Sequence, residues 1–246
     1  MQLVYKVQQR LRLVRLLLLH PQIIRTILAV RRKHLTYLRI EDLCDLVDLV
    51  LSYERWGTPG IMLETGCAAG GSAITLASAK NPQRCLFVYD VFGMIPPPSS
   101  KDGVDVHERY QKILDGQSHG ISGTMYYGYQ SDLYAQVQQR FADFGYPVTD
   151  HHVHLVKGLY EDTLVIDQPV LLAHIDCDWY DSVMTCLKAI EPYLVIGGTL
   201  VIDDYYNWSG CKLAVDDYFA NKQMSYTFLK RGRLHITKRS AQAIHS

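Results

Sequence analysis

The stretch from Ile61 to Ser72 constrains the fold of this chain more than any other segment. It reads IMLETGCAAGGS, an apolar run that ends in an acid, followed by a turn of small residues and a helix start. Gly66 and Gly70 allow a sharp bend and a close ligand approach, because a Cβ at either position would collide with the ligand. Unpaired N–H groups at the start of the helix would face that ligand. The stretch predicts the first strand, turn and helix of a nucleotide-type α/β fold.

The spacing of the glycines indicates which ligand the turn suits. It is G-x-x-x-G-G, and Ala68 stands where a dinucleotide fingerprint has its second glycine, against which the pyrophosphate packs. The turn therefore favours a ligand without pyrophosphate, such as S-adenosylmethionine, over a nicotinamide dinucleotide. A tight strand-to-helix turn with no ligand remains the alternative at this point.

Composition predicts a single large domain with an appendage and reduced cysteines. The chain has 246 residues and 48% hydrophobic residues, enough for one substantial core. None of its six cysteines forms a C-x-x-C pair, and most lie in apolar or helical runs. This pattern is typical of buried thiols in a cytoplasmic protein. We find no convincing signal peptide, and no run of about 20 apolar residues that could span a membrane.

Charge is unevenly distributed, although the net charge is zero. Residues 1–40 contain nine Lys and Arg and no acid, so the remainder carries sixteen basic and twenty-five acidic residues. Such asymmetry predicts contact of residues 1–40 with an anionic surface, as in peripheral membrane attachment, or with the acidic body of another subunit in a homo-oligomer. Nucleic acid is an unfavourable partner, because the rest of the chain is net acidic.

Periodicity predicts three N-terminal helices and then an alternation of strands and helices. The helices are expected at 3–19, 22–36 and 41–55, and the turn cluster 56–60 is the best boundary between a basic helical region, 1–56, and a main domain, 57–246. Parallel strands are expected at 61–65, 85–90, 152–157, 170–176 and 199–203, and helices at 71–80, 131–144, 181–194 and 210–221.

The predicted fold is α/β, a doubly wound, mostly parallel seven-stranded sheet with an N-terminal helical appendage. A hairpin between Ser225 and Lys238 supplies its antiparallel edge. Residues 93–130 form a long segment rich in Pro, Gly and Tyr, and a loop of that length is usually a lid or a binding loop.

Acidic residues follow the predicted strands where ligands bind in such sheets, beyond the carboxyl ends. Glu64 ends the first strand, and Asp90 ends the second about twenty residues after the glycines, where an acid can accept hydrogen bonds from ribose hydroxyls. An ordinary turn aspartate is the alternative for Asp90.

Four more carboxylates follow the strands at 170–176 and 199–203. Asp176 and Asp178 form D-x-D, and Asp203 and Asp204 form D-D. Like charges at about 4 Å repel by several kcal/mol at an intermediate dielectric, so neighbouring strands of this kind favour a divalent cation. All-oxygen ligands select Mg²⁺ or Ca²⁺ over Zn²⁺. The alternative is that Asp203 and Asp204 only cap the next helix or turn.

Five motifs taken together resemble the macrocin O-methyltransferase family over about residues 57–221. They are ETG with GGS at 64–72, DVFGMIP at 90–96, KGLYEDTL at 157–164, IDCDWYDS at 175–182, and GG at 197–198 leading to IDDY at 202–205. The family comprises S-adenosylmethionine-dependent enzymes that use Mg²⁺ to methylate sugar hydroxyls of glycosylated natural products. The chain departs from the family's usual sequence at the Cys67-Ala68-Ala69 turn and at Cys177.

The resemblance implies a set of site residues. The metal ligands match Asp176, Asp203 and Asp204, and Asp176 is the expected base or orienter of the sugar hydroxyl. His107 in the 93–130 lid is a second candidate for the base. Contacts with S-adenosylmethionine are expected from the glycine turn and from three later strand ends: Glu64, Thr65, Gly66, Gly70, Ser72, Asp90, Gly158, Leu159, Tyr160 and Asp176.

The expected acceptor is a small molecule that contains a sugar. Tyr126, Tyr127, Tyr129, Trp179 and Trp208 could stack on a sugar or on an aromatic aglycone. A catechol-type O-methyltransferase, which also uses Mg²⁺ and acidic strand ends, therefore remains an alternative. A nucleic-acid methyltransferase is less favoured. Base N-methyltransferases commonly have Pro-Pro and an aromatic residue after the fourth strand, whereas this chain has DCDW at 176–179, without a proline.

Overall fold

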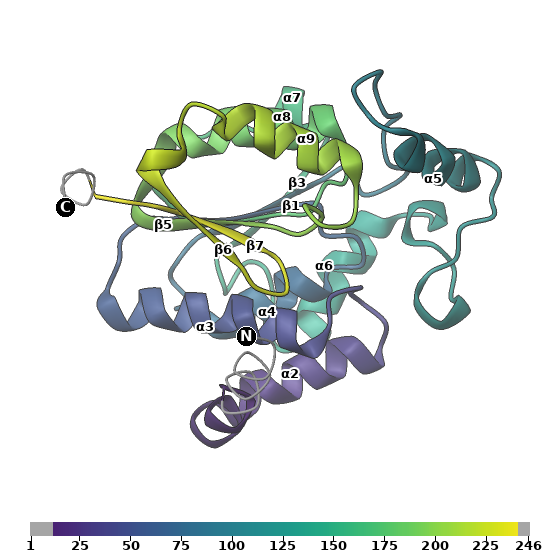
Figure 1. Cartoon of the computed structure of the whole chain (residues 1–246). Coiled ribbons are helices and arrows are strands. Elements are labelled where there is room, and N and C mark those ends of the chain that lie inside the picture. The colour runs from purple at the N-terminus through teal and green to yellow at the C-terminus, as the bar shows by residue number, and fades with distance from the viewer. Residues whose placement is uncertain (1–11, 241–246) are drawn as a thin grey trace.

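A computed structural model describes residues 12–240, in which a seven-stranded sheet lies between two layers of helices (Figure 1). The strand order is β3-β2-β1-β4-β5-β7-β6. Strands β1 (Ile61–Thr65), β2 (Leu86–Asp90), β3 (Val153–Lys157), β4 (Val170–Ile175) and β5 (Leu194–Ile202) pair in parallel, and the hairpin of β6 (Tyr226–Lys230) and β7 (Leu234–Lys238) pairs antiparallel to β5 through β7. The predicted fold class is confirmed.

One face of the sheet is covered by the N-terminal helices, by the helix after the glycine turn and by the helix that precedes β3. These are α2 (Pro21–Arg32), α3 (Ile40–Trp56), α4 (Gly71–Ala79) and α6 (Leu133–Asp143). Their buried side chains form one hydrophobic cluster, in which Ile27, Val47 and Ile74 are fully buried. The N-terminal helices therefore share a core with the sheet and with α4.

The opposite face is covered by α7 (Tyr160–Thr163), α8 (Tyr180–Ile190) and α9 (Ser209–Phe219) (Figure 1). Val183 and Leu187 of α8 and Ala214 of α9 belong to a second cluster with the facing residues of β4 and β5. Every residue of β1 and β4 is buried, as expected for central strands covered on both faces.

Several elements differ from the sequence-based expectation, among them the short helix α7, which was not predicted. β5 begins at Leu194, five residues before the predicted start, and the helix before it, α8, ends at Ile190. The register of β5 against β4 shifts beside Gly197, whose φ is +79°, so the strand includes the pair of glycines before the predicted start. The 93–130 segment also contains a helix, α5 (Val104–Leu114), which was not predicted.

The helix predicted at 3–19 is present from Arg12 to Leu19, and its first part lies outside the described residues. Between residues 12 and 240, no single helix meets the length and hydropathy expected of a membrane span. The segments Arg12–Leu19 and Pro21–Arg32 meet that requirement only when joined, and their axes are bent by 115°.

Candidate active site

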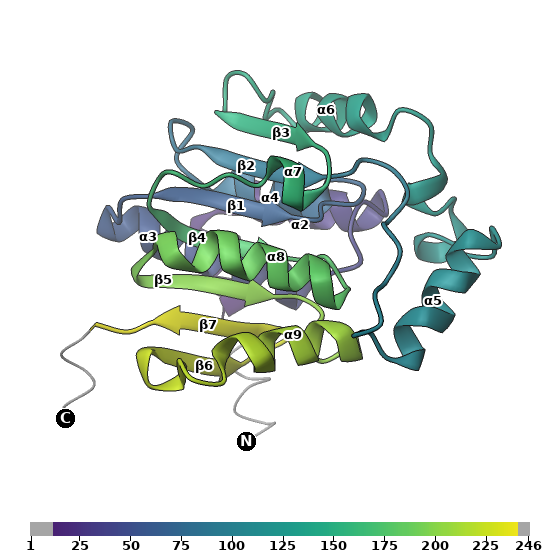
Figure 2. The ribbon, with the colours of Figure 1, turned by 90° about the horizontal axis from the view of Figure 1, so that it is seen from above.

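The lining residues define a cleft at the carboxyl ends of the parallel strands. These strand ends point toward α5 (Figure 2). The cleft has two arms that share the backbone of Gly66 and the side chains of Asp90, Asp176 and Asp178. One arm continues past Leu159 and Tyr160. The other arm continues between the 93–130 lid and the end of β5. Its further lining residues include Tyr37, Arg109, Tyr126, Trp179, Asp203, Asp204, Trp208 and Arg233. Two ligands could therefore meet at the shared residues.

The glycine turn forms the floor of the cleft. Gly66 has φ +86°, and a Cβ on it would lie 1.8 Å from the carbonyl oxygen of Asp176. The backbone at β1 and β4 is this close because Asp176 N donates to Thr65 O at 2.9 Å. Gly70 is the N-cap of α4 and has φ +89°. The turn therefore depends on glycine at position 66 for steric and conformational reasons together.

Asp90 holds the turn in place from the end of β2. Its Oδ2 accepts hydrogen bonds from the backbone N–H groups of Cys67 at 2.8 Å and Ala68 at 3.2 Å, and its Oδ1 accepts one from Phe92 at 2.7 Å. Burial raises the pKa of Asp90, and these three hydrogen bonds act in the opposite direction. Asp90 also lines both arms, so it is placed where the sequence predicted an acid for ribose.

The four carboxylates predicted at the ends of β4 and β5 come together in the cleft. Burial and the neighbouring Asp203 and Asp204 raise the pKa of Asp176 well above its usual range. Burial and Asp204 do the same for Asp178, and burial with Asp203 raises the pKa of Asp204 to about 6. Asp178 is not in a strand and has φ +57°, so its place in the cleft comes from the turn after β4 and not from strand periodicity.

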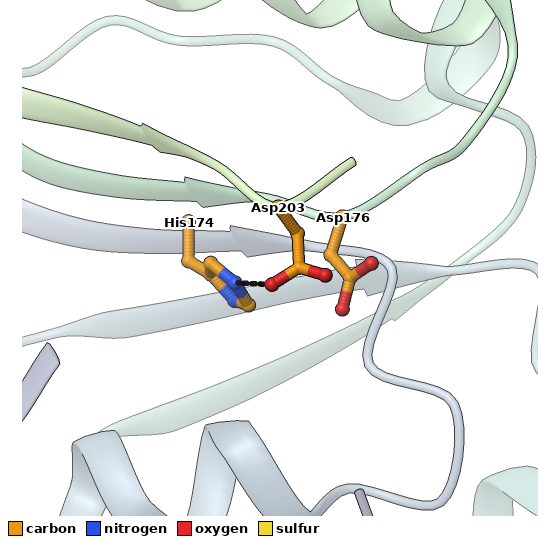
Figure 3. Close-up of side chains that lie close together, drawn as sticks. All are labelled: His174, Asp176 and Asp203. Carbon is orange, nitrogen blue, oxygen red and sulfur yellow. Dashed lines mark hydrogen bonds and ion pairs between the residues drawn. The ribbon is translucent and has the colours of Figure 1, made fainter. Parts of the chain in front are cut away.

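This cluster fits a hard divalent cation. One oxygen each of Asp176 and Asp203, together with a nitrogen of His174, lie within 4.8 Å of one another (Figure 3). Oδ2 of Asp204 is buried and has no hydrogen-bond partner, and Asp204 lines the same arm of the cleft. An unpaired buried carboxylate oxygen among other carboxylates is the arrangement that Mg²⁺ or Ca²⁺ would satisfy.

His174 lies beside this cluster but is unsuited to bind a metal. Its Nδ1 is 2.8 Å from Oε1 of Glu64, and its Nε2 is 3.4 Å from Oδ1 of Asp203. Burial lowers the pKa of His174, but the hydrogen bonds to Asp203 and Glu64 outweigh it and raise the pKa to about 9. A protonated imidazole has no free lone pair, so Asp176, Asp203 and Asp204 are the better ligand set.

The remaining predicted site residues lie at different distances from the cleft. Leu159 and Tyr160 line one arm, and the N–H of Gly158 donates to the carbonyl of Asp90 at 3.1 Å. Glu64, Thr65 and Ser72 are buried beneath the turn and are not among the lining residues. His107 is exposed, its Nε2 lies 3.1 Å from the carbonyl of Ser99, and it does not line the cleft.

Several lining or supporting residues were not identified from the sequence. Tyr37 enters from the segment between α2 and α3, and Arg233 enters from the turn between β6 and β7. No local pattern marks either residue, because both reach the cleft through the packing of distant elements. His174 had a weak signal, as a single ionisable residue in the otherwise apolar β4.

Comparison with known proteins places the chain in a family. Residues 35–230 match the model of the macrocin-O-methyltransferase (TylF) family. The 8-demethyl-8-(2,3-dimethoxy-alpha-L-rhamnosyl)-tetracenomycin-C 4'-O-methyltransferase of Streptomyces olivaceus is 30% identical over 186 residues, which cover 73% of this chain and 64% of that protein. The mycinamicin III 3''-O-methyltransferase of Micromonospora griseorubida is 28% identical over 194 residues, 74% of this chain and 69% of that protein.

Solved structures share the fold. The O-methyltransferase NovP superposes with a TM-score of 0.69 at 22% identity, covering 84% of this chain and 83% of that chain. The calicheamicin methyltransferase CalS11 has a TM-score of 0.59 at 18% identity, covering 94% and 91%. The matches with the first two curated relatives span 64% and 65% of those proteins' lengths. By its family match and its fold, the chain belongs to the macrocin-O-methyltransferase (TylF) family.

Proposed function

We propose that this protein transfers the methyl group of S-adenosylmethionine to a sugar hydroxyl of a glycosylated natural product, with Mg²⁺ as the metal. The observation that carries the proposal is the meeting of Asp176, Asp203 and Asp204 in the same cleft as the glycine turn. Family membership supports the reaction class.

The arm past Leu159 and Tyr160 suits the methyl donor. Asp90, Gly66 and Tyr160 line this arm. Asp90 suits the ribose, the backbone of Gly66 suits the charged amino-acid portion, and Tyr160 suits the adenine. S-adenosylmethionine would supply an electrophilic methyl group, and Mg²⁺ held by the carboxylates would lower the pKa of a hydroxyl bound to it.

Asp176 lies at the junction of the two arms, so its carboxylate can both orient the acceptor hydroxyl and accept its proton. His107 is a weaker candidate for the base, because it lies outside the cleft. The chain's own contribution is to hold the hydroxyl in line with the methyl group and to exclude water from the space between them.

The acceptor arm has aromatic walls. Trp179 and Trp208 meet edge to face with ring centroids 5.9 Å apart, and Trp179 Nε1 donates to the carbonyl of Pro96 at 3.0 Å. Such walls suit a sugar or an aromatic aglycone. The name of the relative from Streptomyces olivaceus contains a rhamnosyl group, which favours a sugar over a free catechol. A nucleic-acid acceptor is not favoured, because aspartates outnumber arginines in the lining.

The test has a binding arm and a turnover arm. S-adenosylhomocysteine and Mg²⁺ should each raise the melting temperature, and NAD should not. Transfer of labelled methyl from S-adenosylmethionine should occur to a glycosylated natural product, with mycinamicin III and a rhamnosylated tetracenomycin C as the first acceptors tried, and should stop with EDTA. Asp204→Asn should lose this transfer, whereas the exposed control Asp150→Asn should keep it. Full turnover in EDTA would contradict the metal role, and transfer to catechol alone would contradict the sugar acceptor.

We also propose a cytoplasmic location and a homo-oligomer. All six cysteines are free, in keeping with a reducing compartment. Leu17 and Leu18 in the segment Arg12–Leu19 are 53% and 74% exposed, and the basic charge of residues 1–40 complements the acidic remainder of a second copy. Light scattering should show an oligomer that the pair Leu17→Glu and Leu18→Glu dissociates. A wild-type monomer that sediments with phosphatidylserine vesicles would instead support peripheral membrane attachment.

A further inference from the structure

One oxygen of Asp203 contacts two side chains, those of Arg233 and His174. Arg233 Nε donates to Oδ1 of Asp203 at 2.6 Å, and His174 Nε2 lies 3.4 Å from the same oxygen. Figure 3 shows the bond between His174 and Asp203 and the carboxylate of Asp176 beside them. Oδ1 is therefore committed to protein partners, and Oδ2 is the oxygen of Asp203 that is left for a cation.

Arg233 and His174 are themselves in contact with further buried carboxylates. His174 Nδ1 is 2.8 Å from Oε1 of Glu64, and both side chains are fully buried. On the other side, Arg233 Nη2 is 3.9 Å from Oδ2 of Asp42, which Arg39 also contacts at 3.0 Å. These contacts form a continuous chain of ionisable side chains that starts at the exposed Arg39 and runs inward through Asp42, Arg233, Asp203, His174 and Glu64.

This charge chain joins elements that are far apart in sequence. Asp42 belongs to the first turn of α3, Asp203 follows β5, and Arg233 precedes β7. The hairpin turn fits tightly against α3, because a Cβ on Gly232 would lie 1.8 Å from Oδ1 of Asp42. The backbone on both sides of Arg233 is thus fixed by packing, which limits the positions that its guanidinium can take.

A fixed guanidinium can define the direction of a carboxylate in a way that a mobile one cannot. The Arg233 side chain is 16% exposed and that of Asp203 is 7% exposed, so water competes little for their hydrogen bond. Groups that hydrogen-bond to a metal-binding carboxylate orient it, and their loss typically weakens metal affinity 10–100-fold. Arg233 also lines the cleft and therefore lies close enough to influence the cation site directly.

We propose that Arg233 is a positioning residue, which holds Oδ1 of Asp203 so that Oδ2 faces the cation, and that the C-terminal hairpin thereby completes the metal site. This inference rests on the proposed use of Mg²⁺. In the opposite role, Arg233 would be a counter-ion that pairs with Asp203 and competes with the metal. The two roles predict changes of opposite sign in metal affinity.

The experiment titrates Mn²⁺, as a paramagnetic substitute for Mg²⁺, into the full-length chain with S-adenosylhomocysteine present. Electron paramagnetic resonance reports free Mn²⁺, and calorimetry measures the affinity for S-adenosylhomocysteine separately. The variants are Arg233→Met and Arg233→Lys. Arg231→Met is the matched control, because Arg231 lies in the same turn but pairs with Asp45, at 3.8 Å, and not with Asp203.

We expect Arg233→Met to weaken Mn²⁺ binding 10–100-fold, Arg233→Lys to weaken it less, and Arg231→Met to leave it within twofold. The affinity for S-adenosylhomocysteine should stay within twofold in all three, which a general loss of structure would not allow. If Arg233→Met fails to fold, Arg233→Lys alone decides, and an unchanged Mn²⁺ affinity in it overturns the proposal.

An unchanged or tighter Mn²⁺ affinity in a folded Arg233→Met variant would overturn the positioning role but leave the proposed function standing. Absence of Mn²⁺ binding to the wild-type protein would instead overturn the metal site itself, and the positioning role with it. The two failures are therefore distinguishable.

Discussion

Glu64 and His174 form an ion pair of 2.8 Å in the centre of the sheet, where neither side chain is exposed to solvent. Glu64 is the penultimate residue of β1, just before the glycine turn, and His174 lies opposite it in the register of β1 and β4. The second nitrogen of His174, Nε2, contacts Oδ1 of Asp203, so the pair is linked to the acidic cluster. The acid of the turn motif thus acts in the core of the protein, under the cleft that it was expected to line.

Removal of this buried acid should be strongly destabilising. Glu64→Ala leaves the His174 cation, whose pKa is raised to about 9, without one of its two carboxylate partners. Breaking a buried ion pair by removing one partner typically costs about 3–5 kcal/mol. Chemical denaturation should show a loss of that size, whereas the exposed Glu108→Ala should change little. A loss below about 1 kcal/mol for Glu64→Ala would show that the pair is dispensable.

Substitution of Gly66 should cost more than its left-handed conformation alone requires. Gly66 and Gly145 have similar φ values, +86° and +82°, but only at Gly66 would a Cβ meet other atoms, with Asp176 O at 1.8 Å. Gly145→Ala should cost about 1–2 kcal/mol, the usual penalty for a left-handed residue. Gly66→Ala should exceed that and lose S-adenosylhomocysteine binding in calorimetry. Equal effects of the two substitutions would contradict a steric role for the turn.

The lid should loosen when Asp102 is removed. Asp102 is 7% exposed, its Oδ1 accepts from Tyr180 N at 2.8 Å, and its Oδ2 accepts from Ser99 N at 2.9 Å, so it fastens the lid to α8. Asp102→Ala should cost about 1.5–3 kcal/mol, as for hydrogen bonds to charged groups. Hydrogen exchange should accelerate in residues 93–114. The control Asp115→Ala, at the exposed end of α5, should leave that exchange unchanged; equal acceleration would refute the anchoring role.

His235 should make the protein less stable in acid. Burial first, and then the nearby charges of Arg231 and Arg12, lower the pKa of this histidine in β7 to about 3. The unfolded chain, with a pKa near 6.5, binds more protons between these values, so stability is lost as the pH falls below about 6.5.

At about 1.4 kcal/mol per pH unit, this group accounts for a loss of roughly 2–3 kcal/mol by about pH 4.5. Denaturation at several pH values gives the free energy of unfolding of wild type and of His235→Gln. The slope of this free energy against pH should differ between the two proteins. The exposed His107→Gln should keep the wild-type slope. Parallel slopes for wild type and His235→Gln would contradict the lowered pKa.

The sequence predicted the elements whose residues share one strong local pattern. The apolar runs of β1 and β4 identified buried parallel strands, and the carboxylates at the ends of β4 and β5 identified a common edge. The start of β5 was missed because Gly197 continues the strand through a register shift instead of ending it. α5 was missed because only Val106 and Ile113 of its residues are buried, which leaves too faint an apolar stripe.

Residues that reach the site from distant elements could not be predicted locally. Arg233 contacts Asp203 only because β7 inserts between β5 and β6, and that strand order is not contained in any short stretch. Tyr37 enters the cleft because the N-terminal helices pack on α4, a consequence of the shared core. Local patterns therefore predicted the carboxylates that meet in the cleft, but not the side chains that contact them from other elements.

The most direct test of the account is a crystal structure of the wild-type protein grown with S-adenosylhomocysteine and Mn²⁺, with anomalous diffraction used to locate the ion. The account predicts one anomalous peak bound by carboxylate oxygens of Asp176, Asp203 and Asp204, beside the sulfur of S-adenosylhomocysteine in the neighbouring arm. A structure that contains S-adenosylhomocysteine but has no ion among these three carboxylates would contradict it.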